Sequence, residues 1–414
     1  MSESGDILSA PAPVEKANTA RFARRKEAVL HAAIGVLNSQ GFKGMTLADV
    51  AAKVGLTTTS VTYYFRKKEQ LAVECFLFGL DRLEAMVDAA ASEPTLEARL
   101  GRLIDEHLAL VAAARRGETP PMTIFSDIRA LSEEHRVPVV DAFRRMFMKI
   151  RAMFRAPGYE HLDGLSRATR THVLLEQIFW SSAWLPRFEI EDFPRMRERM
   201  FDILTRGVAP AGADWSPVEI DIRPREGDPT RETFLRAATP LINERSYRGV
   251  SVTDIAASLN VTKGSFYHHM DAKDDVVVAC FDRTFEVMRA AQFAAEALPT
   301  DRWTALASAV TALVARQVEP DGLLLRTSAL QALPETLRLS TVWRADSVSQ
   351  RFASMISDGI AEGSIRPVDP FLAAQMMSAA INAAADLIAW AGGVNPKAVG
   401  DLYARPVLMG LLVP

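Results

Sequence analysis

Two short stretches of the chain carry side chains that could bind nucleic acid. In the first, hydroxyl groups crowd residues 57–62, two tyrosines follow, and a basic segment at residues 21–26 precedes them. Hydroxyls at the start of a helix can bond phosphate oxygens or base edges, and Arg or Lys neutralises phosphate charge. The candidate DNA contacts of this stretch are Arg21, Arg24, Arg25, Lys26, Thr46, Thr57, Thr58, Thr59, Ser60, Thr62, Tyr63, Tyr64 and Lys68.

The second stretch offers similar groups in the other half of the chain. Hydroxyl residues open two short apolar segments, and Lys, Tyr and His residues accompany the second of them. Such side chains just beyond a helix can bond phosphate oxygens and fix the register on a duplex without reading its sequence. The candidate contacts here are Ser251, Thr262, Lys263, Gly264, Ser265, Tyr267, His268, His269 and Lys273.

Both stretches belong to an internal repeat. Residues 25–76 align with residues 230–281 without a gap, and the identical positions include Cys75 and Cys280. A repeat with so long a period indicates two whole domains rather than a solenoid of short units. Because each cysteine lies just before a Phe in an apolar segment, we expect both as small buried residues and predict no disulfide or metal role.

Helices must position these groups, because apolar residues recur at intervals of three and four along the chain. Glycines separate a supporting helix (residues 25–40) from two short helices (47–54 and 57–63), with Thr46 opening the first short helix and Gly55 preceding the second. The equivalent positions of the second copy are Gly249, Ser251, Asn260 and Thr262. Two short helices joined by a tight turn form a helix-turn-helix pattern.

Longer helices follow each pattern, so the fold class is all-α. The expected helices are 68–91, 96–114, 137–154, 161–185 and 193–207, then 273–297, 303–318, 335–362, 370–391 and one after Pro396. The predicted organisation is a disordered tail (1–20), a helix-turn-helix domain (21–67), a helical regulatory domain (68–207), an irregular linker (208–229), a second helix-turn-helix domain (230–272) and a second regulatory domain (273–414).

Both halves resemble the tetracycline-repressor (TetR) family of transcriptional regulators. The similarity lies in MTLADVAAKVGLTTTSVTYYFRKKEQL at residues 45–71, in VSVTDIAASLNVTKGSFYHHMDAKDDV at residues 250–276, and in EGSIRPVDPFLAAQMM at residues 362–377. The resemblance implies a three-helix DNA-binding domain and a larger helical domain for ligand binding and dimerisation in each half. It also implies that helices 161–185 and 193–207 pair with 370–391 and the C-terminal helix, as an intrachain pseudo-dimer.

The two copies depart from the family pattern in different ways. The second copy keeps the family's Gly, Tyr and His as Gly264, Tyr267 and His269, but has Met270 where Phe is usual. The first copy keeps that Phe as Phe65, and its residues at the other three positions are Thr59, Thr62 and Tyr64. We therefore expect two non-identical readers and an imperfectly palindromic operator.

Local charge separates the copies further. The whole chain carries a net charge of −3, so any nucleic-acid footprint must be local. Residues 21–70 contain nine Lys or Arg against three Asp or Glu, whereas residues 226–275 contain six against eight. Because phosphate neutralisation dominates affinity, the first copy is expected to bind DNA more strongly in a sequence-independent way.

The regulatory domains are rich in Met and aromatic residues, which suits a small hydrophobic or aromatic effector with a polar end. The same residues could equally be core packing, and Asn382 could cross-link two helices. The candidate ligand contacts are His107, Met122, Phe125, Phe147, His172, Gln177, Trp180, Trp343, Met377 and Asn382.

The sequence lacks the motifs of common enzymes and metal-binding proteins. The chain has no HExxH, nucleophile elbow, Gly-rich phosphate loop or metal-spaced Cys/His cluster, so we predict no catalytic residue, no metal and no cofactor. No apolar run is long enough to span a membrane, and a cytoplasmic location is expected. The predicted function is a repressor released by an effector. The alternatives are a ligand-sequestering protein that no longer reads DNA, an all-helical enzyme, and an assembly of two chains with four reading heads.

Overall fold

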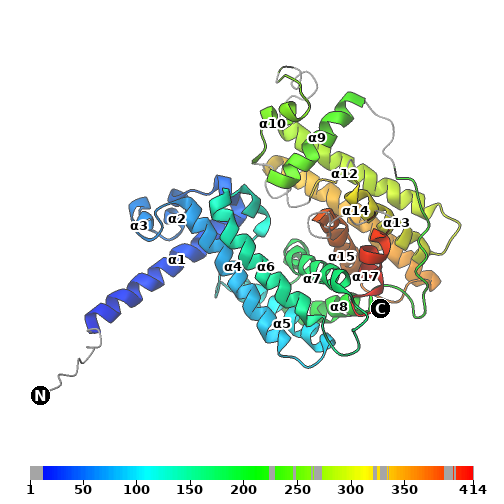
Figure 1. Ribbon diagram of the computed structural model, residues 1–414, viewed down its shortest axis with the longest axis horizontal. Coiled ribbons are helices and arrows are strands. Elements are labelled where there is room, and N and C mark those ends of the chain that lie inside the picture. Colours follow the sequence, from blue (N-terminus) through cyan, green and yellow to red (C-terminus); the bar gives the residue numbers. More distant parts are fainter. Residues whose placement is uncertain are drawn as a thin grey trace, which may run out of the picture.

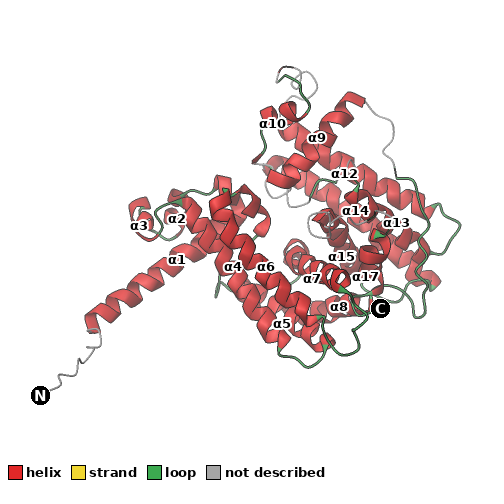
Figure 2. Cartoon of the chain, in the orientation of Figure 1, coloured by secondary structure: helices red, strands yellow, loops and turns green. Residues whose placement is uncertain are grey.

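The computed structural model describes residues 13–222, 229–245, 249–262, 264, 273–319, 324–326, 333, 335–386, 395 and 398–413. Every regular element in these ranges is helical and none is a strand, which confirms the predicted all-α fold (Figure 2). None of the described helices combines the length and apolar character needed to cross a membrane.

The first half begins with a small domain and continues into a larger bundle (Figure 1). Its elements are α1 (Pro13–Gly44), α2 (Leu47–Lys53), α3 (Thr58–Tyr64), α4 (Lys68–Ala91), α5 (Leu96–Arg115), the 3-10 turn η1 (Phe125–Ala130), α6 (Glu133–Met153), α7 (Gly164–Trp184), the 3-10 turns η2 (Leu185–Arg187) and η3 (Ile190–Asp192), and α8 (Phe193–Arg206). Helix α4 contacts α1, α5 and α6, so it joins the small domain to the bundle.

The second half repeats this plan. Its described elements are α9 (Pro229–Arg245), α10 (Val252–Ser258), α12 (Lys273–Glu296), α13 (Arg302–Val318), α14 (Glu335–Glu362), α15 (Pro370–Ala383), the turn η6 (Ala384–Asp386), the π-helical turn η7 (Gly400–Ala404) and α17 (Arg405–Met409). Helix α12 contacts α9, α13 and α14, as α4 does in the first half. The helix expected over 370–391 is α-helical only to Ala383, and residues 387–394 lie outside the described ranges.

The N-terminal helix differs from the sequence prediction. We expected a disordered tail over residues 1–20, but α1 already begins at Pro13, so residues 13–20 are helical. Proline is favoured in the first turn of a helix because its missing N–H has no partner there in any case. The predicted end of this helix is observed, since Gly41 adopts φ 68° and interrupts the helical backbone.

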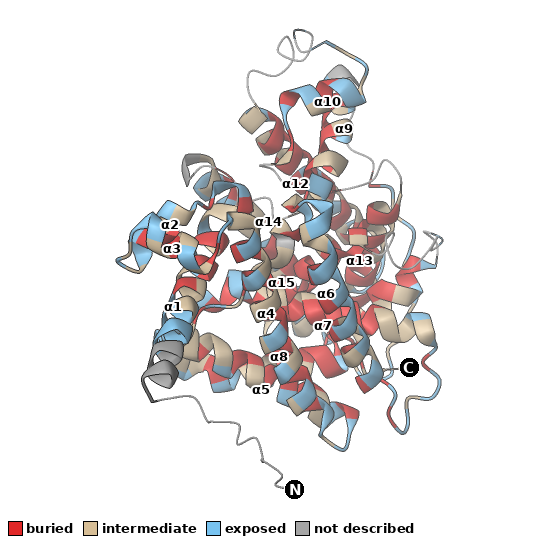
Figure 3. Cartoon of the chain, turned by 60° about the vertical axis from the view of Figure 1, so that its left-hand side comes forward, coloured by how far each residue is buried: buried red, intermediate tan, exposed pale blue. Residues whose placement is uncertain are grey.

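The regulatory helices of the two halves share one hydrophobic core, coloured red in the centre of Figure 3. This core runs from Val29 in α1 to Leu411 near the C-terminus. The second helix-turn-helix domain packs around a separate cluster that includes Phe234 and Phe281. Cys75 and Cys280 are buried and free, as predicted, and burial raises the pKa of the Cys280 thiol to about 11.

The seam between the halves is formed by α7 and α8 against α15, η7 and α17 (Figure 1). Two backbone hydrogen bonds cross it reciprocally: Val208 N–H donates to Leu408 O at 2.7 Å, and Leu411 N–H donates to Leu204 O at 2.8 Å. The two backbone segments approach closely because Gly207 and Gly410, each with positive φ, follow the last helices of the two halves. A Cβ on either glycine would overlap backbone atoms of the other half.

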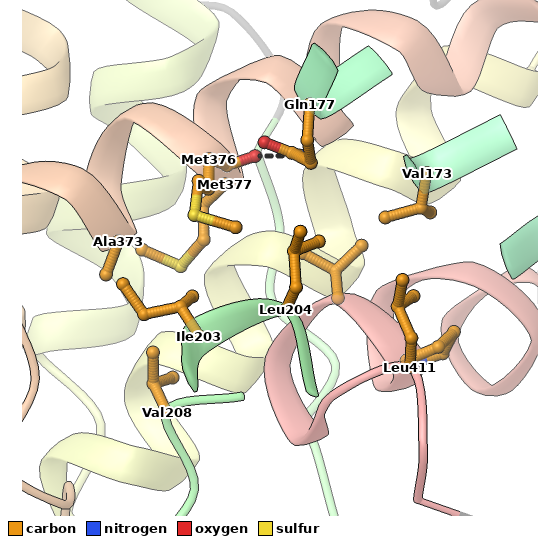
Figure 4. Close-up of a pocket in the computed structure, with 11 residues that line it drawn as sticks. Val173, Gln177, Ile203, Leu204, Val208, Ala373, Met376, Met377 and Leu411 are labelled. Atoms are coloured by element: carbon orange, nitrogen blue, oxygen red, sulfur yellow. Dashed lines mark hydrogen bonds between the residues drawn. The ribbon is translucent and has the colours of Figure 1, made fainter. Parts of the chain in front are cut away.

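Side chains fill the seam closely. In Figure 4, Gln177 from α7 donates a 3.0 Å hydrogen bond to the Met376 carbonyl of α15, beside Leu204 of α8 and Leu411. The space left there is about 10 Å³, which is no more than one water molecule needs. The helices whose pairing the resemblance implied are thus in contact.

The predicted linker is irregular over its described part and lies against the second half. The Trp215 indole N–H donates to Asp401 Oδ1 at 2.8 Å, and the Trp303 indole N–H donates to Asp214 O at 3.0 Å. The two indole rings are 6.1 Å apart. These contacts explain why a segment without helical periodicity still has a fixed course.

Candidate DNA-reading units and a shared cavity

Hydroxyl groups build the first reading unit by capping its two short helices. Thr46 Oγ1 accepts from Asp49 N–H at 3.1 Å at the start of α2, and Thr57 Oγ1 accepts from Ser60 N–H at 3.2 Å at the start of α3. Gly55 turns the chain between them with φ 64°. Thr46 and Thr57 were predicted as DNA contacts, and the structure uses both as helix caps.

Helix α3 exposes a polar and aromatic face. Thr58 and Thr59 are exposed at its N-terminal end, and the Tyr63 side chain is 74% exposed at the other. Phe22 of α1 holds this end, with its ring 5.8 Å from Tyr63 and 5.0 Å from Tyr64. This aromatic contact places the basic residues 21–26 of α1 beside α3.

Most basic residues of the first unit are on its surface. Arg21, Arg24 and Arg25 are exposed on α1, and the Lys26 ammonium lies 5.3 Å from the centre of the Phe65 ring. Lys68 differs from the prediction, because its ammonium reaches the carbonyls of Phe42, Lys43 and Met45 at 3.3 to 3.5 Å. It therefore ties α4 to the end of α1 inside the domain.

The second reading unit has the same frame with other residues. Ser251 and Asp254 form a reciprocal cap at the start of α10, and Asn260 takes the place of Gly55 with φ 55°. Asn is one of the few residues that adopts this left-handed conformation readily. Gly264 is exposed. Five predicted contacts lie outside the described residues: Lys263, Ser265, Tyr267, His268 and His269.

Two arginines of the second unit, Arg236 and Arg245, are paired with acids. Glu232 accepts hydrogen bonds from Arg236 and from Arg283, both at 2.9 Å, and Arg245 lies 3.6 Å from Asp254. Although burial alone would raise it, these guanidinium groups hold the pKa of Glu232 below its usual value. Among the described residues of this unit, the charges of Arg236 and Arg245 are therefore compensated by acids of the same unit.

One asparagine in each half joins its reading unit to the regulatory bundle through two hydrogen bonds, and we call this contact the asparagine clasp. Neither asparagine is among the predicted contacts. The Asn38 amide donates to Met122 O and accepts from Ile124 N–H, each at 2.9 Å. The Asn243 amide likewise donates to Leu324 O and accepts from Arg326 N–H, each at 2.9 Å. Their identity within the repeat was the only sequence signal.

A cavity of about 760 Å³ lies between these two clasps. Its walls come from α1, α5, η1, α6 and α7 of the first half, and from α9, Arg326, α15 and η6 of the second. The predicted ligand contacts that line it are His107, Met122, Phe125, Trp180 and Asn382.

The other predicted ligand contacts lie elsewhere. Phe147 packs against the core, Gln177 and Met377 line the small space at the seam, and Trp343 is 73% exposed on α14. His172 is buried at the seam, 3.3 Å from the Tyr403 hydroxyl. Other helices cover His172, Gln177 and Met377, whereas Trp343 faces solvent.

His107 has one nitrogen without a partner. Its Nε2 lies 2.6 Å from Ser181 Oγ, whose single hydrogen is donated to Ile178 O at 2.6 Å. Nε2 must therefore carry the imidazole hydrogen, which leaves Nδ1 as a bare acceptor. Nδ1 is buried without a hydrogen-bond partner among the described residues, and burial lowers the pKa of His107 to about 4. The ring is neutral at pH 7.

Charged residues gather at the second-half side of the cavity. Arg129 donates to Asn243 O at 2.7 Å and to Asp386 at 3.0 Å, and Arg326 donates to both Asp386 oxygens. Although burial would raise it, these arginines hold the pKa of Asp386 below its usual value. Burial raises the pKa of the neighbouring Glu176 to about 7.

One group of side chains could in principle hold a metal ion. It consists of His172, Glu176 and Asp386, whose potential ligand atoms all lie within 4.8 Å of one another. Two guanidinium groups already bond Asp386, and their positive charge opposes a further cation. This donor set does not fit a divalent ion, so we interpret the cluster as an ion-pair network that joins the halves.

Comparison with known proteins gives three family matches. Residues 29–75 and 234–280 each match the family described as bacterial regulatory proteins, tetR family, and residues 296–411 match the tetracyclin repressor-like C-terminal domain. The Transposon Tn10 TetC protein of Escherichia coli is 33% identical over 79 residues, which are 19% of this chain and 40% of that protein.

Two further proteins show the same likeness. The negative transcriptional regulator IcaR of the Staphylococcus aureus (strain Newman) biofilm operon icaADBC is 36% identical over 56 residues, 13% of this chain and 30% of IcaR. The chain thus spans well under half the length of these two relatives. The regulator PfmR from Thermus thermophilus superposes with a TM-score of 0.36 and 24% identity, over 43% of this chain and 98% of PfmR.

Proposed function

Because the chain belongs to the TetR family of bacterial regulatory proteins, with two N-terminal units in tandem, we propose that it is a sequence-specific DNA-binding transcriptional repressor. The observation that carries the proposal is the exposed face of α3 beside the basic residues 21–26 of α1. Thr58 and Thr59 are exposed at the helix N-terminus, where hydroxyls and backbone N–H groups meet DNA in helix-turn-helix proteins. Arg21 and Arg25 supply charge for phosphate contacts.

One chain presents two reading heads in this proposal. The reciprocal hydrogen bonds at Val208 and Leu411 have the pattern of an interface between equivalent partners, because each half donates one backbone hydrogen bond and accepts one. The fused second half takes the place of a second subunit. Reading heads of a dimeric helix-turn-helix protein contact half-sites about 34–36 Å apart. Because the two heads differ in sequence, the operator is an imperfect palindrome.

A small apolar effector would release the DNA by binding in the shared cavity. Asn38 of α1 and Asn243 of α9 both line the cavity, so an occupant reaches the supporting helix of each reading unit. A ligand that favours one separation of these helices shifts the population between DNA-competent and DNA-incompetent states. The effector then changes the spacing of the heads rather than blocking either of them.

Selection of binding sites from a random DNA pool tests the reading function. Wild-type protein is expected to select two dissimilar half-sites, and Thr58→Ala and Lys263→Ala are each expected to relax one half-site only. Ser340→Ala removes an exposed hydroxyl of α14 and serves as the control, with no change in preference. Absence of a salt-dependent gel shift on any selected site would favour the ligand-sequestering alternative.

A further inference from the structure

Three aromatic rings meet where α1 passes the end of α3, those of Phe22, Tyr63 and Tyr64. We propose that Phe22 is a positioning residue for DNA binding: its ring orients the Tyr63 side chain so that the phenol hydroxyl donates to a phosphate oxygen at the half-site of the first unit. The inference rests on the proposed function, because it assigns a further residue to the same reading face.

The Tyr63 ring is held edge to face by two other rings. Its centre lies 5.8 Å from that of Phe22 at an interplanar angle of 80°, and 5.4 Å from that of Tyr64 at 83°. Nearly perpendicular rings at these distances attract each other, because the positive edge of one ring faces the negative face of the other. The two contacts together favour one orientation of the Tyr63 side chain.

Of the three rings, that of Tyr64 connects the cluster to the protein interior. Tyr64 is partly buried and packs against the hydrophobic core, and the Phe22 ring lies 5.0 Å from it. Tyr63 is 74% exposed and Phe22 is 40% exposed. Removing the Phe22 ring therefore releases Tyr63 on one side without opening a cavity in the core.

The Tyr63 hydroxyl is free to bond DNA. It is exposed and makes no hydrogen bond with the described residues. Arg21 and Arg25 are exposed in the same stretch of α1 as Phe22, so the rings lie where the protein attracts phosphates. Figure 1 shows α3 and this part of α1 at the outer end of the first half. Tyrosine hydroxyls contact phosphate oxygens in protein–DNA complexes and fix the register without reading bases.

The second unit lacks this cluster in its sequence. Extending the repeat alignment places Gly227 at the position of Phe22, and His268 and His269 at those of Tyr63 and Tyr64. Because glycine has no side chain, no ring of the second unit corresponds to that of Phe22. Loss of the contact should therefore affect one half-site only.

Fluorescence anisotropy on the duplex that the full-length protein selects from a random pool tests the proposal. Tyr63→Phe removes only the hydroxyl and should weaken binding about fivefold, as expected for one neutral hydrogen bond. Phe22→Ala should weaken binding about threefold, and the double variant no more than Tyr63→Phe alone, because Phe22 acts through that hydroxyl. The salt slope should stay unchanged in all three variants, since a neutral donor releases no counterion.

A scan with single methylphosphonates locates the contact, because each replaces one charged phosphate oxygen by a methyl group. At one position of the half-site that Thr58→Ala relaxes, the replacement should weaken the wild type more than it weakens Tyr63→Phe or Phe22→Ala. Positions in the other half-site should be equally sensitive in all three proteins. A merely structural role of Phe22 would lower affinity without changing the sensitivity at one particular phosphate.

Matched variants separate the ring from general effects of substitution. Phe22→Tyr keeps the ring and should restore wild-type affinity. Phe293→Ala removes a 56% exposed ring from the last turn of α12 and should leave DNA binding unchanged. Thermal unfolding of Phe22→Ala should match that of the wild type. If it does not, Phe22→Leu, which keeps apolar bulk but lacks an aromatic edge, serves for the same comparison.

Failure of this inference can be told apart from failure of the reading function. Wild-type affinity in Phe22→Ala, additive losses in the double variant, or an altered sensitivity in the second half-site overturns the role of Phe22 and leaves the reading function standing. Failure of the protein to bind any duplex overturns both.

Discussion

The first and second reading units are held by equivalent contacts but present different charges. Each has a hydroxyl cap at its first short helix, Thr46 or Ser251, and a clasp through Asn38 or Asn243. In each, a buried cysteine thiol lies against a carbonyl of the supporting helix. The duplication has thus kept the cap of the first short helix and the contacts of the supporting helix.

The charged surfaces have diverged around this frame. Arg21 and Arg25 of the first unit have no ion pair among the described residues, whereas Arg236 and Arg245 of the second face Glu232 and Asp254. Since each phosphate contact needs a cation that is not already neutralised, we expect the first unit to be the stronger source of sequence-independent affinity. In the proposed one-chain reader, fusion permits this difference, because one surface no longer has to serve both half-sites.

The largest effect is expected where the halves cross. Gly207→Ala and Gly410→Ala each place a Cβ against backbone of the other half, at a positive φ, and each should lower the free energy of unfolding by roughly 3 kcal/mol. Gly212→Ala is the control, since Gly212 has the same sign of φ but open space around it. Urea denaturation measures all three. A clear inequality between Gly207 and Gly410 would break the symmetry inferred for the seam.

The buried histidines should make the first regulatory domain sensitive to acid. The pKa of His107 is about 4 when folded, below its ordinary value of 6.5, so its stabilising contribution is present above pH 6.5 and lost as pH falls toward 4. Glu176 acts in the opposite sense: its pKa of about 7 lies above 4.5, so its contribution is present below pH 4.5 and lost as pH rises through 7.

Stability between pH 7 and 5 isolates the His107 contribution. As pH falls from 7 to 5, the free energy of unfolding should decrease by about 2 kcal/mol less in His107→Leu than in the wild type. Denaturation at each pH measures this difference. The second regulatory domain, residues 273–414, contains no histidine, so no variant there can reproduce this change. Parallel pH profiles for wild type and variant would mean that His107 is not a buried neutral group.

The two asparagine clasps offer a smaller and more direct comparison. Asn38→Ala and Asn243→Ala each leave a carbonyl and an N–H without their partner, and each should cost about 1.5 kcal/mol in thermal unfolding. Both variants should also weaken the effector's influence on DNA affinity. Loss of that influence in only one of them would show that a single half transmits the signal.

The charge difference predicts the smallest effect. The double change Arg21→Ala and Arg25→Ala should weaken DNA binding about tenfold at moderate salt and reduce the salt slope by about 2. The matched double change Arg236→Ala and Arg245→Ala should weaken binding less than threefold, because those arginines are paired within the protein. Fluorescence anisotropy at several salt concentrations measures both. Equal losses would contradict the asymmetry.

Periodicity and caps predicted the elements well. Helix α4 occupies the predicted residues 68–91, and α14 the predicted 335–362, because their apolar faces and flanking polar residues are local signals. The turn at Asn260 was also readable, since Asn tolerates the left-handed conformation that Gly55 adopts in the other copy. The helical start of α1 at Pro13 was not, because its composition resembles that of a tail.

The site was only half predictable. His107, Trp180 and Asn382 were selected as polar or aromatic residues on apolar helices, and they line the cavity. Periodicity reports that a face is buried but not which helix covers it, so Gln177 at the seam could not be separated from them. Nor did the sequence show that Trp343 is exposed. The pairing of His107 with Ser181, and the joint walls of the cavity, depend on contacts between distant segments that a single sequence does not specify.

The central claim is that one chain supplies both reading heads of an asymmetric DNA reader. Native mass spectrometry of the protein on its selected operator duplex tests it most directly. We predict a complex of one 45.5 kDa chain per duplex, whose two half-sites differ in sequence. Two chains on a symmetric duplex would contradict it.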